Sequence, residues 1–336
     1  MKNSLYIGMI TCILVLVTGC SEKEVLTPVN DYIYFNTEVS SRGELMTSME
    51  GKTFGVTAYK YSNTIDWETV KAKATSNVFD DHGLEVFWTE DGNGNGYHTY
   101  NNPTSWDAAS KYTFFGYYPY DRVSISDRDI EGVPYIDYNL PENVENMADV
   151  MTASLFNTNN SASNAVGLTF KHRLVAMDIQ ARNFLDEGID VTINSLSVSF
   201  DNLQYNKVRL PLDASLAITP AVENGWDGKP TYSILSSPVT IEPTNMASGS
   251  SAATSLSSNS SLIFIPQAAN LKGKINITYQ INGGNETTIN PEFDTGKSML
   301  AGRKFYLLIN FSKTSVSIAI VDSGEWSDEN IEIEFE

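Results

Sequence analysis

The decapeptide KYTFFGYYPY, Lys111–Tyr120, is the most aromatic stretch of this 336-residue chain. Its rings include the adjacent pairs Phe114-Phe115 and Tyr117-Tyr118, and successive side chains of a β-strand point to opposite faces. The pattern therefore predicts a strand that is buried on both faces and ends at Pro119, which cannot donate a sheet hydrogen bond. A stacking platform for sugars or bases is the alternative, but aromatic side chains more often fill cores.

Similar strand signals extend in both directions from this decapeptide. The chain has 17 Tyr, 15 Phe and 5 Trp, and short β-branched or aromatic runs alternate with turn residues, as in β-sandwiches. The best short-helix candidate of the first half is 67–74. The principal predicted strands cover 31–39, 54–61, 84–89, 97–100, 111–118, 168–181, 191–200, 207–212, 262–265, 275–281, 305–311 and 316–321.

This pattern predicts an all-β protein with few short helices and two cores. The run of small residues at 157–164 is a candidate domain boundary. We therefore expect one β-sandwich domain over 31–165 and a second over 166–336. The predicted strand 168–181 would open the second core, because its apolar residues change from one face to both.

The N-terminus has the features of an export signal. A charged start is followed by an apolar run from Leu5 to Val17, too short for a membrane span, which needs ~20 residues. The small residues before Cys20 resemble a bacterial lipobox. That resemblance implies removal of the signal peptide 1–19, acylation of Cys20 and a lipidated tether over 20–30. Acyl chains would then anchor the mature protein to the membrane.

Composition and motifs narrow the range of possible functions. With 41 acidic and 22 basic residues, the formal net charge of −19 argues against nucleic acid or anionic lipid as partners. The three histidines, His82, His98 and His172, are far apart in sequence, and no catalytic motif occurs. Asp91–Gly96 matches the start of a calcium loop but lacks its closing Glu, so a plain turn is favoured. We expect no enzyme activity, no cofactor and no metal.

Several sequence blocks together resemble the fimbrillin-like lipoproteins of the Bacteroidales, the subunits of type V pili. The blocks follow one another over most of the mature chain. They are Phe114-Phe-Gly-Tyr-Tyr-Pro119, Asp149-Val-Met-Thr-Ala153, Leu168-Thr-Phe-Lys-His-Arg-Leu-Val-Ala176, Phe264-Ile-Pro-Gln267, Leu300-Ala-Gly-Arg-Lys-Phe-Tyr306 and Trp326.

The resemblance implies two sandwich domains similar to transthyretin and a lipoprotein on the outer face of the outer membrane. It also implies that a trypsin-like protease cuts after an arginine near the N-terminus and removes the first strand. In this sequence the cut maps to Arg42-Gly43. A strand from another subunit would then fill the open groove. If Arg42 stays uncut, the protein would instead remain an anchor or stand alone on the membrane.

The C-terminal segment is the candidate donor strand. Ile331, Ile333 and Phe335 alternate with glutamates, so the apolar side chains could enter successive pockets of a groove. The same segment could also be an edge strand folded within its own domain.

A second function remains open from the sequence. A surface lipoprotein could capture host or dietary glycans with exposed aromatic side chains, and a host protein or glycan is a possible partner in either case. The candidates for such contacts are Trp67, Trp88, Trp106 and Trp226.

Overall fold

The computed structural model describes residues 32–39, 48–72, 76–79, 83–91, 96–126, 132–160, 165–223, 226–243, 253–257 and 261–325. Within these ranges the protein is almost entirely β-structure, with one four-residue α-helix, α1 (Trp67–Val70), and one 3₁₀ turn, η1 (Val144–Asn146). The predicted all-β class is confirmed. None of the described helices has the length and apolar character that a membrane crossing requires.

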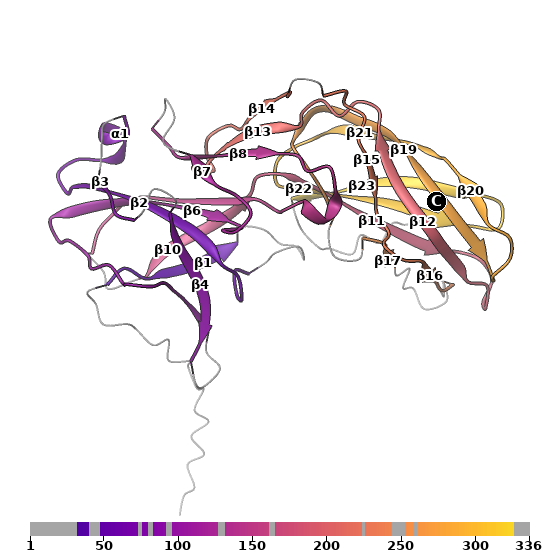
Figure 1. The fold of residues 1–336 in the computed structure, drawn as a ribbon, viewed down its shortest axis with the longest axis horizontal. Helices are drawn as coiled ribbons and strands as arrows, with labels where there is room; N and C mark the ends of the chain where they lie inside the picture. Colours follow the sequence, from indigo (N-terminus) through magenta and orange to yellow (C-terminus); the bar gives the residue numbers. More distant parts are fainter. Residues whose placement is uncertain are drawn as a thin grey trace, which may run out of the picture.

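The first group of strands closes on itself and encloses one apolar core (Figure 1). The strands hydrogen-bond in the order β3-β2-β4-β5-β1-β10-β9-β6, and β2 also pairs with β6. We call this group the first sandwich. Its members are β1 (Phe35–Val39), β2 (Phe54–Ser62), β3 (Ser76–Asn77), β4 (Leu84–Glu90), β5 (Gly96–Thr99), β6 (Ser110–Tyr118), β9 (Met151–Thr158) and β10 (Val166–His172).

A second group, here called the second sandwich, has two sheets on either side of a larger core (Figure 1). One sheet contains β11 (Val175–Asn183), β17 (Thr254–Ser255), β18 (Leu262–Phe264), β22 (Arg303–Phe311) and β23 (Val316–Glu325). The other contains β12 (Val191–Phe200), β15 (Thr231–Ser233), β16 (Val239–Ile241), β19 (Gln267–Ile281), β20 (Thr287–Ile289) and β21 (Glu292–Met299).

A small antiparallel sheet lies between the two sandwiches along the upper side of Figure 1. It consists of β7 (Ile125–Ser126), β8 (Tyr135–Asn139), β13 (Lys207–Pro211) and β14 (Thr219–Ala221). Because β8 and β13 pair over five positions, hydrogen bonding joins segments that lie about 70 residues apart in the chain.

The aromatic decapeptide forms β6 and is buried on both faces, as predicted. Phe114 belongs to the core of the first sandwich, whereas its neighbour Phe115 points to the opposite face, into the larger cluster. Both side chains are fully buried, and the strand ends at Tyr118, directly before Pro119. The core interpretation of these rings is confirmed.

The prediction of one long strand over 168–181 is wrong, because the chain changes sheet at Arg173-Leu174. β10 pairs with β1 and β9 of the first sandwich, and β11 runs parallel to β22 of the second. The buried guanidinium of Arg173 donates to Ala214 O at 2.8 Å and Leu216 O at 3.1 Å. These contacts with another loop hold the junction, which the continuous apolar pattern did not reveal. β10 lies after the boundary expected at residue 165, yet it is hydrogen-bonded to strands of the first sandwich. The division of the chain into two domains at this position stays a prediction.

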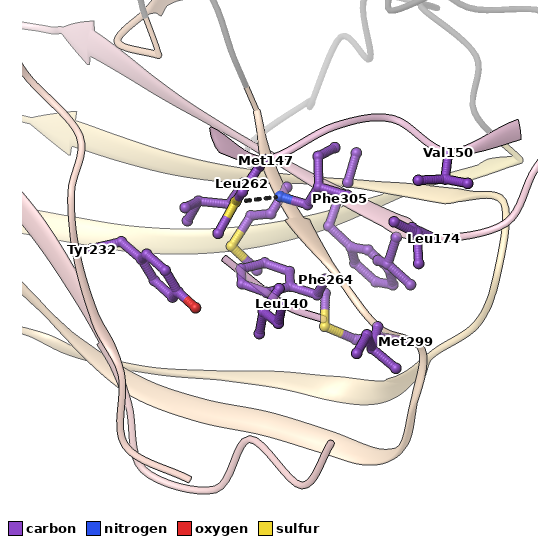
Figure 2. Packing of buried hydrophobic residues seen from close by; sticks show 14 of the residues in the cluster. Leu140, Met147, Val150, Leu174, Tyr232, Leu262, Phe264, Met299 and Phe305 are labelled. Atoms are coloured by element: carbon purple, nitrogen blue, oxygen red, sulfur yellow. Dashed lines mark hydrogen bonds between the residues drawn. The ribbon is translucent and has the colours of Figure 1, made fainter. Parts of the chain in front are cut away.

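Apolar packing continues from the inter-sandwich segment into the second sandwich (Figure 2). Met147 and Leu174 lie in the same buried cluster as Phe264 and Phe305. The backbone N–H of Ile263 in β18 donates to Met147 Sδ at 3.1 Å, the contact dashed in Figure 2. The segment after η1 is therefore packed into the second core and does not act as a free linker.

Candidate functional site

The first described strand closes the ring of the first sandwich. β1 runs parallel to β10 over five positions, from Phe35 opposite Val166 to Val39 opposite Phe170. On its other side it pairs with β5 only once, between Phe35 and His98. β1 is thus paired along its whole length on one edge and shares a single register pair with β5 on the other. We call the position that it occupies, between β10 and β5, the β1 seat.

Two side chains of this N-terminal segment fill the first core. Ile33 is 0% and Phe35 5% exposed. The Phe35 ring lies 6.4 Å from Phe54, 5.8 Å from Tyr100 and 5.9 Å from Phe114, measured between ring centroids. An aromatic side chain is therefore surrounded by aromatic side chains in favourable edge or tilted geometry.

The outward-facing positions of this segment restrict the type of side chain less. Tyr32, Asn36 and Glu38 are exposed, so residues facing the core alternate with residues facing solvent, as expected for a strand covered on one face. Tyr34 lies between these extremes and is half-buried. The seat thus constrains the inward positions far more than the outward ones.

Backbone hydrogen bonds complete the seat. The N–H of Ile33 donates to Thr104 O at 2.9 Å, and its carbonyl accepts from the Tyr100 hydroxyl at 2.9 Å. The N–H of Val166 donates to Tyr34 O at 2.6 Å. These bonds use main-chain atoms of the strand, so any extended segment in the same register could make them.

His98 connects β1 with the segment that follows the undescribed residues 40–47. With its proton on Nε2, the ring donates to Met49 O at 3.0 Å and accepts from the Thr37 hydroxyl through Nδ1 at 3.4 Å. Burial of His98 lowers the pKa of the imidazole below its ordinary value. The lowered pKa favours the neutral form of the ring.

The sequence model of a family described as fimbrillin-like matches residues 46–323. The chain belongs to the fimbrillin-like family. The expected resemblance is thereby confirmed, and the match covers every strand from β2 to β22 and most of β23.

Solved structures share the fold of this fimbrillin-like protein. A fimbrial protein from Bacteroides vulgatus superposes with a TM-score of 0.60 at 20% identity, covering 88% of this chain and all of the other. A candidate cell adhesion protein from Bacteroides uniformis gives a TM-score of 0.50 at 16% identity, covering 89% of this chain and all of the other. A comparison with curated proteins gives no match.

The site residues predicted from sequence lie outside the described residues. These are Cys20, Arg42, Gly43, Ile331, Ile333 and Phe335. Arg42 follows the end of β1 at Val39 and precedes the described segment that starts at Ser48. The residues that form the seat, above all Tyr100, Phe114 and His98, were not singled out as functional, because their proximity to β1 comes from the fold.

The tryptophans proposed for glycan contacts are not gathered on an open surface. Trp67 is 1% exposed and packs against Tyr59 and Phe115. Trp88 and Trp106 are half-buried in the first sandwich, and Trp226 is half-buried with its indole N–H donating to a backbone carbonyl. Nor do His, Cys, Asp and Glu come together in a group of three or more suited to a metal ion anywhere in the described ranges.

His172 has a structural partner. Its Nδ1 lies 2.9 Å from a carboxylate oxygen of Asp149, and both side chains are largely buried. The interaction joins the ends of β10 and of the segment before β9, next to the junction at Arg173. This geometry agrees with the structural interpretation preferred from the sequence.

Proposed function

We propose that this protein is a subunit of a cell-surface pilus, exported as a lipoprotein acylated at Cys20 and assembled by donor-strand exchange. Proteolysis after Arg42 would release the lipid anchor together with β1. The observation that carries this proposal is the β1 seat, in which two buried side chains and pairing along β10 hold a strand that precedes Arg42.

The physical argument concerns what departure of β1 would leave behind. The pockets of Ile33 and Phe35 would be open, and burial of such side chains is worth roughly 1.5–3 kcal/mol each. The N–H of Val166 and the carbonyl of Thr104 would lose their main-chain partners. Such a groove favours addition of another extended segment, which restores both kinds of contact.

Residues 21–336, which retain every described residue, provide the test. Limited trypsin digestion of this form is followed by N-terminal sequencing and size analysis, with Arg42→Gln as the matched control. We expect a product that begins at Gly43, keeps its folded core and forms oligomers, whereas the Arg42→Gln protein stays monomeric. An uncut Arg42 bond, or a cut product that stays monomeric and binds no strand, would support a static surface lipoprotein instead.

A further inference from the structure

Four aromatic side chains face away from the core of the first sandwich. Tyr32 and Tyr34 come from the segment that leads into β1, Phe87 from β4 and Tyr97 from β5. Tyr97 is 48% and Tyr32 42% exposed, whereas Tyr34 and Phe87 are half-buried. We call these four residues the aromatic platform. None of them belongs to either hydrophobic cluster of the described residues, so core packing does not account for them.

In the β4–β5 pair, Phe87 and Tyr97 face the same side of the sheet. Phe87 lies opposite Thr99, and Thr89 lies opposite Tyr97. The two aromatic residues are therefore diagonal neighbours, whose Cβ atoms are typically about 7–8 Å apart in such a sheet. This spacing places the two rings beside each other, with a threonine next to each.

The β1 segment extends the platform on the other side of β5. Phe35 and His98 lie opposite each other and are buried, so the alternate residues Tyr34 and Asn36 point outward. The antiparallel register places Asn36 beside Tyr97 and makes Tyr34 a diagonal neighbour of that ring. Figure 1 shows β4, β1 and β10 along the same side of the first sandwich.

The face that carries the platform is open next to β1. A Cβ atom built on Gly167, which lies opposite Asn36, would meet nothing within 4 Å. Within the part of the chain that the structure describes, the hydroxyls of Tyr32, Tyr34 and Tyr97 make no hydrogen bond. Their polar groups therefore have no partner to give up when a ligand binds.

We infer that the aromatic platform binds a neutral glycan, whose sugar rings lie flat on the side chains of Tyr34, Phe87 and Tyr97. The C–H groups on the face of a sugar ring carry slight positive charge and meet the negative face of an aromatic ring. The neighbouring Asn36 and Thr89 supply hydrogen-bond donors and acceptors for the sugar hydroxyls. Binding to the uncut chain does not depend on the strand exchange proposed above.

Charge and area both favour this class of ligand. The platform has no charged member, and Glu38 and Glu85 flank it on the same face. With a net charge of −19 on the whole chain, acidic sugars are repelled. The exposed parts of the four side chains offer about 300 Å², well below the ~800 Å² that each partner contributes to a stable protein complex. Such an area suits a few sugar rings and is too small for a second protein.

The two tyrosines of the β1 segment precede Arg42 in the chain. If proteolysis at that bond releases β1, as proposed above, Tyr32 and Tyr34 leave with it, while Phe87 and Tyr97 remain. Glycan binding is therefore a property of the uncut chain, and the protein used to test it carries Arg42→Gln.

Affinity electrophoresis of residues 21–336 with Arg42→Gln tests the inference. Native gels contain hydroxyethyl cellulose, mixed-linkage β-glucan, galactomannan or xyloglucan, and carboxymethyl cellulose is the charged counterpart of the first. We expect at least one neutral polymer to retard the protein and carboxymethyl cellulose not to do so. Retardation by none of the four neutral polymers, or equal retardation by carboxymethyl cellulose, would overturn the inference. Strand exchange would remain open in that case, because it is tested with the cut chain.

Variants locate the binding site. Tyr97→Ala, at an exposed position, should weaken binding to the retarding polymer at least about tenfold, as measured from mobility against polymer concentration. The double variant Tyr32→Ala/Tyr34→Ala should also weaken binding, because the β1 segment supplies these rings. Leu300→Ala removes an apolar side chain that is 53% exposed outside the platform and should bind like the parent. Unchanged binding by Tyr97→Ala or by the double variant would contradict a platform shared between β1 and β5.

Discussion

β1 and β11 each run parallel to a neighbouring strand, but they differ in the number of backbone pairs and in the share of their residues that is buried. β1 runs parallel to β10 over five register pairs, and β11 runs parallel to β22 over eight. On its other edge β11 pairs with β17 at two positions and β18 at three, whereas β1 meets β5 at one. Eight of the nine β11 residues are buried, against one of the five in β1.

This difference concerns how firmly each strand is held in its sandwich. β11 is covered on both faces, so its loss would expose the second core on a large scale. The segment around β1 seals the first core mainly through Ile33, just before the strand, and Phe35, its first residue. Removal of β1 should therefore expose less buried surface than removal of β11.

The largest expected effect comes from a substitution in the strand pair β11–β22. Phe305 of β22 is 0% exposed, lies opposite Met177 of β11 and belongs to the cluster in Figure 2. Phe305→Ala should lower the free energy of unfolding by about 3–5 kcal/mol, because it leaves a cavity that close-packed neighbours fill poorly. Chemical denaturation followed by tryptophan fluorescence measures the change. A decrease of less than about 1 kcal/mol in the free energy of unfolding would contradict the importance of this strand pair for the second core.

Phe35→Ala tests whether β1 can detach by itself, and we expect its effect to be confined to the region around β1. Loss of the ring weakens β1, but the measured cost is limited to detachment of the strand, since the rest of the core can remain folded. We expect amide hydrogen exchange in β1 to accelerate about a hundredfold, while exchange in β11 changes less than about threefold. Asn36→Ala, at an exposed position, is the control. Equal acceleration in both strands would show that β1 and β11 unfold together.

The sequence predicted individual strands better than it predicted their partners. β12 begins at Val191 and ends at Phe200 as expected, because alternating apolar residues and flanking turn residues are local signals. The break at Arg173 was missed because the contacts that hold it, to Ala214 and Leu216, come from more than 40 residues away. Local pattern cannot report such contacts.

The same limit applies to the candidate site. The apolar character of Ile33 and Phe35 indicated a strand, and the family resemblance placed a cut after Arg42, which stays a prediction. However, the seat depends on Tyr100 and Phe114, whose rings pack against Phe35 from more than 60 residues away. The parallel pairing with β10 likewise requires a long connection that the sequence does not specify locally.

Acidification should loosen β1 before it affects β11. Burial lowers the pKa of His98, so the folded state binds fewer protons than the unfolded state. This contribution to stability is complete above the ordinary pKa of about 6.5 and is lost as the pH falls toward the lowered folded-state value, at up to about 1.4 kcal/mol per pH unit.

The measurement is the exchange of β1 amides between pH 7.5 and 5.5, corrected for intrinsic exchange. We expect a rise that is absent from β11, and a much smaller rise in His98→Gln, which keeps a donor toward Met49 O but does not titrate. An identical pH dependence in the His98→Gln protein would assign the effect to other groups.

The smallest expected effect concerns the open outer face of the β1–β10 pair. Gly167 lies opposite Asn36, has ordinary negative-φ backbone, and offers space for a Cβ atom. Gly167→Ala should raise the free energy of unfolding of the first sandwich by about 0.4–1 kcal/mol, because alanine reduces the freedom of the unfolded chain. Gly51→Ala is the matched control: its site is equally open, but its φ of +69° strains an alanine, so this variant should be destabilised. Thermal unfolding of both variants measures the contrast, and destabilisation by Gly167→Ala would mean that this outer face is covered.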